Sequence, residues 1–445
     1  MKSAEFILRD LIQQLQSQIN SRCIFSIFPL LFFILHSQFD NHIGMNPWRG
    51  IGSLPKEVWI LFATNLVNRM GMMGLPFLVI YLTSARGFSP SDAGFVLSIY
   101  GLSALCTSPF AGRLSDAVGP VRVMKLSLLC SGIVLILFPL ASTFPWIIVG
   151  TVLWSVTGEA FRPASMAVIT SVVPSERRRS AFSVNRLAIN LGMSIGPAFG
   201  GFLLMYSYPM IFWVDGATSL MAAVLVTVAM GKRQITVHHT QEATEGGEPI
   251  PAKAIWKDRR LFYFLLTILP VFITFFQHSS TLPLVFFEIL HQPPSAFGFL
   301  FTFNTVLIVL VEIPLNLAMA QWSHRSVLML GALLVGAGFG AMTFATGFWT
   351  VAGTVVIWTF GEMIFLPGAS AYVGDLAPSR QQGLYMGAYQ MVANVSFAIG
   401  PWLGTTIFEK FGPATLWSGL FLICAFASLI LFHSHGQPHR PQEQL

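Results

Sequence analysis

Three ionisable side chains lie deep inside apolar segments of the sequence, where a charge needs a partner or a function. Arg69, Glu159 and Glu362 each follow about 12 residues of such a segment, or roughly 18–20 Å of helix, which reaches the middle of a bilayer. A charge at that depth costs a few kcal/mol or more, so these residues are candidates for function. A carboxylate there can take up and release a proton, which is the chemistry of a proton relay.

Glu159 and Glu362 end near-equivalent stretches, Trp-Ser-Val-Thr-Gly-Glu and Trp-Thr-Phe-Gly-Glu. We therefore expect them to line one central cavity from opposite halves of the molecule. Arg162 is three residues after Glu159, on the same face of a continuous helix, so this pair is expected to neutralise itself, with simple helix stabilisation as the alternative. Glu362 has no basic residue three or four positions away. This difference favours Glu362 as the proton carrier.

Further polar residues in the apolar segments complete the predicted cavity. They are Glu312, His278, Gln277, Asn65, Asn68 and Asn304. His278 is a second candidate proton carrier, and a hydrogen-bonded packing role is the alternative. An adaptable apolar wall near these positions is expected from Met72, Met73, Phe275, Phe276 and Phe365.

The segments that carry these residues are long enough to cross a membrane. Of the 445 residues, 54% are hydrophobic and 10% charged, whereas a soluble domain has about 25% charged residues. Apolar runs of about 20 residues match the roughly 30 Å of hydrocarbon in a bilayer. We predict twelve transmembrane helices, at residues 57–82, 92–112, 121–142, 146–171, 181–205, 209–230, 261–286, 296–320, 326–345, 350–374, 384–408 and 414–432.

Basic residues are concentrated in alternate connections between these helices. The 2–3, 4–5 and 6–7 connections carry groups such as Arg177 to Arg179, whereas the connections on the other side carry only Arg86 and Lys410. This asymmetry predicts that both termini lie in the cytoplasm. The predicted parts are a non-spanning extension before a start at Met45 (1–44), a six-helix half (45–231), a cytoplasmic linker (232–260), a second six-helix half (261–432) and a cytoplasmic tail (433–445).

One long stretch of the chain occurs twice at a constant offset. A shift of 204 residues places Trp154 on Trp358, Pro163 on Pro367, Asn190 on Asn394, Gly196-Pro197 on Gly400-Pro401, Gly200 on Gly404 and Trp213 on Trp417. Most of these residues fix backbone shape, so agreement at one offset indicates an internal duplication. Repeats of six-helix halves are typical of membrane transporters.

Two local motifs add a family resemblance. The 2–3 loop reads Gly112-Arg-Leu-Ser-Asp116-Ala-Val-Gly119-Pro-Val-Arg122, and the fifth helix reads Gly192-Met-Ser-Ile-Gly196-Pro197-Ala-Phe-Gly200-Gly201. The chain resembles the major facilitator superfamily, because the loop is similar to its G-x-x-x-D-R-x-G-R-R signature. The helix motif looks like that of its drug:proton antiporters. Ala117 departs from the signature, and the corresponding loop of the second half has no acid.

These motifs have physical readings of their own. Gly112 allows close helix approach, and Asp116 is expected to pair with Arg113 or Arg122 as a cytoplasmic latch, with a capped turn as the alternative. Pro197 should bend its helix, and Gly192, Gly196 and Gly200 form a small-residue packing stripe. The resemblance implies an outer closure role for this set together with Gly201, Gly400, Pro401 and Gly404.

The resemblance implies an all-α membrane protein with the major facilitator fold, two pseudo-symmetric bundles of six helices. The expected function is proton-coupled efflux of small apolar or amphipathic compounds, a multidrug-type activity, by alternating access. A transporter of one metabolite such as a sugar or amino acid, and a non-transporting sensor or scaffold, are the alternatives. The sequence has no phosphate-binding Gly-rich loop of the Lys-Ser/Thr type. We expect no enzyme activity, no cofactor besides the proton, no metal site and no nucleic-acid partner, and a monomer in the inner or plasma membrane.

Overall fold

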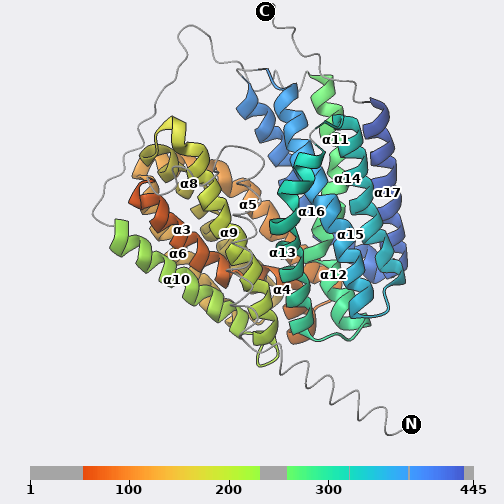
Figure 1. Ribbon diagram of the computed structural model, residues 1–445. Helices are drawn as coiled ribbons and strands as arrows, with labels where there is room; N and C mark the ends of the chain where they lie inside the picture. The colour runs from red at the N-terminus through yellow and green to blue at the C-terminus, as the bar shows by residue number, and fades with distance from the viewer. Residues whose placement is uncertain (1–53, 231–257, 320, 379–380, 435–445) are drawn as a thin grey trace, which may run out of the picture. The chain divides into compact units, whose positions relative to one another are not determined.

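The computed structural model describes residues 54–230, 258–319, 321–378 and 381–434 (Figure 1). The predicted extension, most of the linker and the tail beyond residue 434 therefore lie outside the described residues. Within the described ranges every regular element is a helix, and no strand is present. The prediction of an all-α membrane protein is confirmed.

Nine helical elements and one short 3₁₀ turn form the described first half. They are α3 (Lys56–Gly71), α4 (Gly74–Ile80), the π turn η2 (Tyr81–Ala85), α5 (Pro90–Val118), α6 (Pro120–Leu137), η3 (Phe138–Leu140), α7 (Phe144–Glu159), α8 (Phe161–Val172), α9 (Ser175–Leu204) and α10 (Met210–Met230).

The described second half repeats this order with two differences, an extra 3₁₀ turn after its first helix and a single helix, α15, in place of α7 and α8. Its elements are α11 (Arg259–Phe275), η5 (Phe276–Ser279), α12 (Thr281–Leu284), the π turn η6 (Val285–Ile289), α13 (Pro294–Ala318), α14 (His324–Ala341), η7 (Met342–Phe344), α15 (Phe348–Leu376), α16 (Gln382–Phe411) and α17 (Pro413–Ser434).

Eleven stretches of the described residues are long and apolar enough to cross a membrane. They coincide with eleven of the twelve predicted spans to within a few residues, except that the predicted spans 261–286 and 296–320 end earlier, at residues 279 and 312. The remaining span, 92–112, is the central part of α5. That helix is 29 residues long, and the side chains of three of its residues lie outside those described. The chain is a multi-pass membrane protein.

Short-range sequence signals determine where several helices begin and end. The Ser89 side chain accepts a hydrogen bond from the backbone N–H of Asp92, and Pro90 occupies the first turn of α5. Asp258 and Ser323 cap α11 and α14 in the same way. Gly119, at a φ of 93°, ends α5 and starts α6; only glycine adopts this backbone conformation without strain.

The first span of each half is interrupted, and the two interruptions match. Helix α3 ends at Gly71 and α11 at Phe275, while the following helices end at Ile80 and Leu284. Both are followed by a π turn, Tyr81–Ala85 and Val285–Ile289. All these pairs are separated by the 204 residues found in the sequence repeat. The duplication therefore extends to spans 1 and 7.

Candidate functional site

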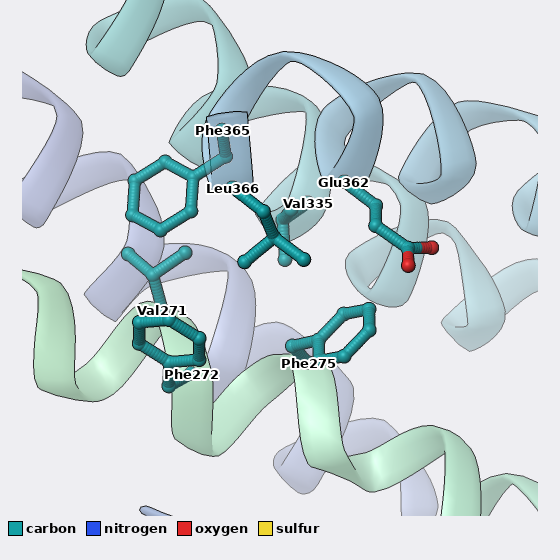
Figure 2. A pocket seen from close by; sticks show the side chains of 7 residues that line it. All are labelled: Val271, Phe272, Phe275, Val335, Glu362, Phe365 and Leu366. Atoms are coloured by element: carbon teal, nitrogen blue, oxygen red, sulfur yellow. The ribbon is translucent and has the colours of Figure 1, made fainter. Parts of the chain in front are cut away.

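Glu362 lies on α15 beside a pocket within the second half. Figure 2 shows its carboxylate at one side of this pocket, whose other lining residues are all apolar: Val271, Phe272, Phe275, Val335, Phe365 and Leu366. Asn304 on α13 donates a hydrogen bond to Glu362 Oε2 at 3.3 Å and another to Thr359 Oγ1 at 2.8 Å. None of the ion pairs among described side chains includes Glu362. Among the described side chains, the amide of Asn304 is therefore its hydrogen-bond donor.

The first half contains an equivalent arrangement around Glu159. Tyr100 on α5 donates its hydroxyl hydrogen bond to Glu159 Oε1 at 3.1 Å, and Ser155 donates to the backbone carbonyl of Tyr100 at 2.8 Å. Tyr100 and Ser155 are 204 residues before Asn304 and Thr359. In each half, therefore, span 2 or 8 supplies a donor to the carboxylate of span 4 or 10.

The expected pair of Glu159 with Arg162 is not formed. Helix α7 ends at Glu159, Ala160 is a turn residue, and α8 begins at Phe161. The described ion pairs do not include Glu159, and Arg162, beyond this turn, is exposed. Glu159 is instead bound by Tyr100, a partner that helical spacing could not indicate.

His278 and Gln277 lie at the interruption of span 7. Nδ1 of His278 is 2.7 Å from the carbonyl oxygen of Phe275, and its ring stacks on Trp358 at 6.1 Å between centroids. Gln277 is fully buried and donates to the carbonyl oxygens of Ile273 and Gly400, both at 2.9 Å. Gln277 therefore stabilises the broken helix, while His278 lies among aromatic rings.

Three other predicted cavity residues contact neighbouring helices. Asn65 donates to Oδ1 of Asn185 at 2.8 Å, and Asn68 donates to Oγ of Ser219 at 3.2 Å. Glu312 on α13 pairs with Arg186 on α9 at 3.4 Å and so connects the two halves. The two asparagines therefore stabilise helix packing within the first half, and Glu312 forms an ion pair between the halves.

Arg69 lies near a buried acid that the sequence analysis missed, Asp215 on α10. Asp215 is 4% exposed, and its Oδ2 accepts a hydrogen bond from the backbone N–H of Gly74 at 3.2 Å. The guanidinium of Arg69 donates to Sδ of Met72 at 2.7 Å, and its buried Nε has no hydrogen-bond partner. Asp215 is the single charged residue within the predicted span 209–230, and this was the signal that could have identified it.

The glycine stripe of the fifth span packs directly against the interruption of span 1. A Cβ atom at Gly192 would lie 2.4 Å from Cβ of Arg69, and one at Gly196 would lie 3.0 Å from the Arg69 carbonyl oxygen. In the second half, a Cβ at Gly404 would lie 2.0 Å from Oε1 of Gln277. In both halves the glycine stripe therefore packs against the interrupted first span. This contact is more specific than general helix packing.

The other face of the same motif contacts the second half of the protein. A Cβ at Gly201 would lie 2.5 Å from the carbonyl oxygen of Pro294, and a Cβ at Gly298 would lie 2.5 Å from that of Pro197. Helices α9 and α13 thus touch backbone to backbone, and Figure 1 shows them side by side. This contact lies at the end of the helices away from the basic loops.

Helices α5 and α16 make a second contact between the halves at the same end. The hydroxyl oxygens of Ser91 and Thr406 are 2.9 Å apart, and the Ser91 N–H donates to Glu409 Oε2 at 2.8 Å. Trp402 N–H donates to Oγ of Ser98 at 3.0 Å. The two halves are therefore closed against each other at this end.

The 2–3 loop motif is only partly described. Gly112 has open space where a Cβ would lie, so the expected close helix approach is absent in this conformation. Arg113 and Arg122 are exposed, and the side chain of Asp116 lies outside the described residues. The latch stays a prediction.

Changing Asp116 to Asn should lower transport several-fold while expression is maintained. The substitution removes the negative charge from a pairing that is expected in one conformational state only, so it shifts the balance between states. Transport and membrane abundance should be measured together, with Asp375→Asn as a control carboxylate. Equal transport by the Asp116 variant and the parent would reduce this residue to a helix cap.

A run of aromatic contacts connects the two carboxylate sites. Tyr100 packs on Trp154 at 5.1 Å and on Phe397 at 6.4 Å, measured between ring centroids. Phe397 packs on Phe276 at 4.9 Å, and Phe276 contacts His278 at 6.3 Å. Rings from both halves therefore lie between the two sites, and the residues that line the described pocket all come from the second half. The shared cavity stays a prediction.

Comparison with known proteins gives consistent matches over most of the chain. The family model described as Major Facilitator Superfamily matches residues 61–293 and 278–435. The Na(+), Li(+), K(+)/H(+) antiporter of Planococcus maritimus is 24% identical over 416 residues, covering 83% of this chain and 94% of that protein. Quinolone resistance protein NorA of Staphylococcus aureus is 21% identical over 405 residues, covering 88% of this chain and 100% of that protein.

Solved structures show the same fold. A crystal structure of a POT family transporter in complex with 5-aminolevulinic acid has a TM-score of 0.71 at 15% identity, covering 85% of this chain and 95% of that one. This likeness confirms the two-bundle architecture.

Proposed function

Because the chain belongs to the major facilitator superfamily and is a transporter of that type, we propose that it exports small amphipathic compounds in exchange for protons. The observation that carries the proposal is the position of Glu362. Its carboxylate has one amide donor, no ion pair among the described side chains and an aromatic pocket beside it. The relatives named as an antiporter and as a quinolone resistance protein support this reading.

The proposed mechanism is competition for the Glu362 carboxylate. In a low-dielectric pocket a bare carboxylate is costly, so a proton or a substrate must replace the lost charge partner. Rings such as Phe272, Phe275 and Phe365 offer apolar and cation–π contacts to an aromatic or cationic compound. If the proton stabilises the conformation from which the compound is released, and the compound stabilises the conformation from which the proton is released, the two are exchanged across the membrane.

Export of ethidium from proteoliposomes that contain the purified protein tests this function. A pH gradient imposed across the membrane should drive ethidium movement against its concentration, and collapse of the gradient with nigericin should abolish it. Norfloxacin, a quinolone, provides a second probe. Failure of a pH gradient to drive either compound, in vesicles whose protein is folded, would refute the proposal.

A second candidate is exchange of an alkali cation for protons at the same carboxylate. The similarity to the Planococcus antiporter is the observation that favours it. Addition of Na⁺, Li⁺ or K⁺ to vesicles with an acidic interior should then dissipate the pH gradient. A response to these ions without any response to ethidium would select this candidate.

Both termini are expected to face the cytoplasm, and residues 1–44 are expected to be dispensable. The prediction rests on the clusters of Lys and Arg in alternate connections. A chain that starts at Met45 and carries a C-terminal reporter active only in the cytoplasm should insert and give signal close to that of the full chain. A silent reporter, or loss of insertion, would contradict the prediction.

A further inference from the structure

The first half holds four ionisable side chains that come from four different spans. Arg69 comes from α3, Tyr100 from α5, Glu159 from α7 and Asp215 from α10. Tyr100 binds Glu159 directly and lies within electrostatic range of Arg69 and Asp215. We call these four residues the first-half cluster. The exchange at Glu362 makes no use of it.

The charge balance of this cluster requires a proton. Two carboxylates and one guanidinium leave one excess negative charge when both acids are ionised. Asp215 is 4% exposed and is in none of the ion pairs among the described side chains. A buried carboxylate without an ion-pair partner is unstable in its charged form, whereas Glu159 is only half-buried and accepts the Tyr100 hydrogen bond. Asp215 is therefore the member expected to hold the proton.

The surroundings of Asp215 can also accommodate its charge once the proton leaves. Helices α3, α4, α6 and α9 pack against α10. Among their described side chains, Arg69 is the charged group that acts on Asp215, and α4 supplies the backbone N–H group of Gly74. Helix α6 brings Gly132 and Ile136 to Gly216, and α9 brings its glycine stripe to Arg69; neither supplies a charge at this level.

The position of Asp215 connects its proton to the backbone of span 1. Asp215 binds Gly74, the first residue after the interruption, while Arg69 precedes it. The Arg69 guanidinium has a methionine sulfur as its hydrogen-bond partner and an unpartnered Nε. Loss of the Asp215 proton leaves a carboxylate that attracts this guanidinium, which draws α3 toward α10 at the Met72–Met73 turn. Protonation releases it.

We infer that Asp215 is a second proton-binding residue of the transport cycle, so that two protons enter for each compound that leaves. This inference rests on the proposed function and extends it. One proton binds at Glu362 in the second half and one at Asp215 in the first. Export of a monovalent cation against two protons moves one net positive charge inward per cycle. Such export responds to membrane potential, whereas one-for-one exchange does not.

Ethidium export at equal pH on both sides, driven by a potassium–valinomycin potential in proteoliposomes, tests the inference. The parent should export ethidium when the side that ethidium leaves is negative. Asp215→Asn should lose this response to potential while it retains export driven by a pH gradient. Asp215→Glu should restore it, because the titratable group returns. Ser219→Ala, a change of a buried residue one turn along α10, should behave as the parent does.

Carboxyl infrared difference spectra between acidic and alkaline pH give a readout that needs no substrate. One protonated-carboxyl band of the parent should be missing from Asp215→Asn and present in Glu362→Gln, Glu159→Gln and Ser219→Ala. If Asp215→Asn does not fold, Asp215→Ser takes its place in both measurements.

Three results would overturn the inference. They are export by the parent that ignores potential, potential-driven export that survives in Asp215→Asn, and loss of the band in Glu159→Gln instead. Complete absence of proton-driven export in the parent would instead contradict the proposed function, and the infrared measurement would still decide whether Asp215 titrates.

Discussion

Replacing Glu362 by Gln is expected to reduce pH-gradient-driven export of ethidium to the level of protein-free vesicles. Gln is nearly isosteric with protonated Glu, can still accept the hydrogen bond from Asn304, and cannot release a proton. The exchange step that alternates proton and substrate at this position would therefore stop. Binding of a neutral amphipathic compound, with chloramphenicol as the probe, should change little, because the aromatic lining is intact.

The control for this variant is Asp375→Asn on the same helix. Asp375 is an exposed carboxylate whose partner is His324 at 3.0 Å, so its loss removes a charge without affecting the pocket. Export and binding should be measured on the same preparations of both variants. Continued gradient-driven accumulation of ethidium by the Glu362 variant would place the carrier elsewhere, with Asp215, Glu312 and His278 as the next residues to change.

Replacing Gly201 by Leu is expected to reduce transport about tenfold while both halves stay folded. Even a Cβ at this position would lie 2.5 Å from the carbonyl oxygen of Pro294 in the other half, and a backbone atom can yield only if α13 moves. Overpacking of this kind costs about 1–3 kcal/mol, which shifts an equilibrium between two states by about 5- to 150-fold. The state in which α9 and α13 touch should therefore be depleted.

Disulfide formation between cysteines at positions 91 and 406 measures this closure. The native Ser91 and Thr406 hydroxyl oxygens are 2.9 Å apart in the closed contact between α5 and α16. In a chain without its native cysteines, Gly201→Leu should slow cross-linking about tenfold. Gly353→Leu is the matched control, since a Cβ at Gly353 meets nothing within 4 Å. Unchanged cross-linking and transport in Gly201→Leu would show that the contact is dispensable.

The transmembrane helices and the duplication could be predicted because their signals are local or periodic. Long apolar runs, basic loops and a constant offset of Trp, Pro and Gly residues do not depend on tertiary contacts. The isolation of Glu362 was visible for the same reason, as no basic residue lies within one helical turn. The structure adds Asn304 as its hydrogen-bond donor.

Features that depend on neighbouring helices were not visible in the sequence. The interruption after Gly71 lies in an apolar run and is held by Asp215 on α10 and the glycines of α9. The expected Glu159–Arg162 pair was wrong because it assumed a continuous helix through Ala160. Asp215 was passed over because it lies near the predicted end of its span, where a charge has access to water. In the fold it is buried.

The matching interruptions of spans 1 and 7 also date from a common ancestor. Breaks and π turns at the same register in both halves are most simply inherited from one six-helix gene that already possessed them before it was copied. Since fusion, the two halves have diverged at ionisable and polar positions. At the 204-residue offset, Asp215 corresponds to Gly419 and Tyr100 to Asn304. The present protein thus consists of two duplicated halves that carry different polar residues within one polypeptide.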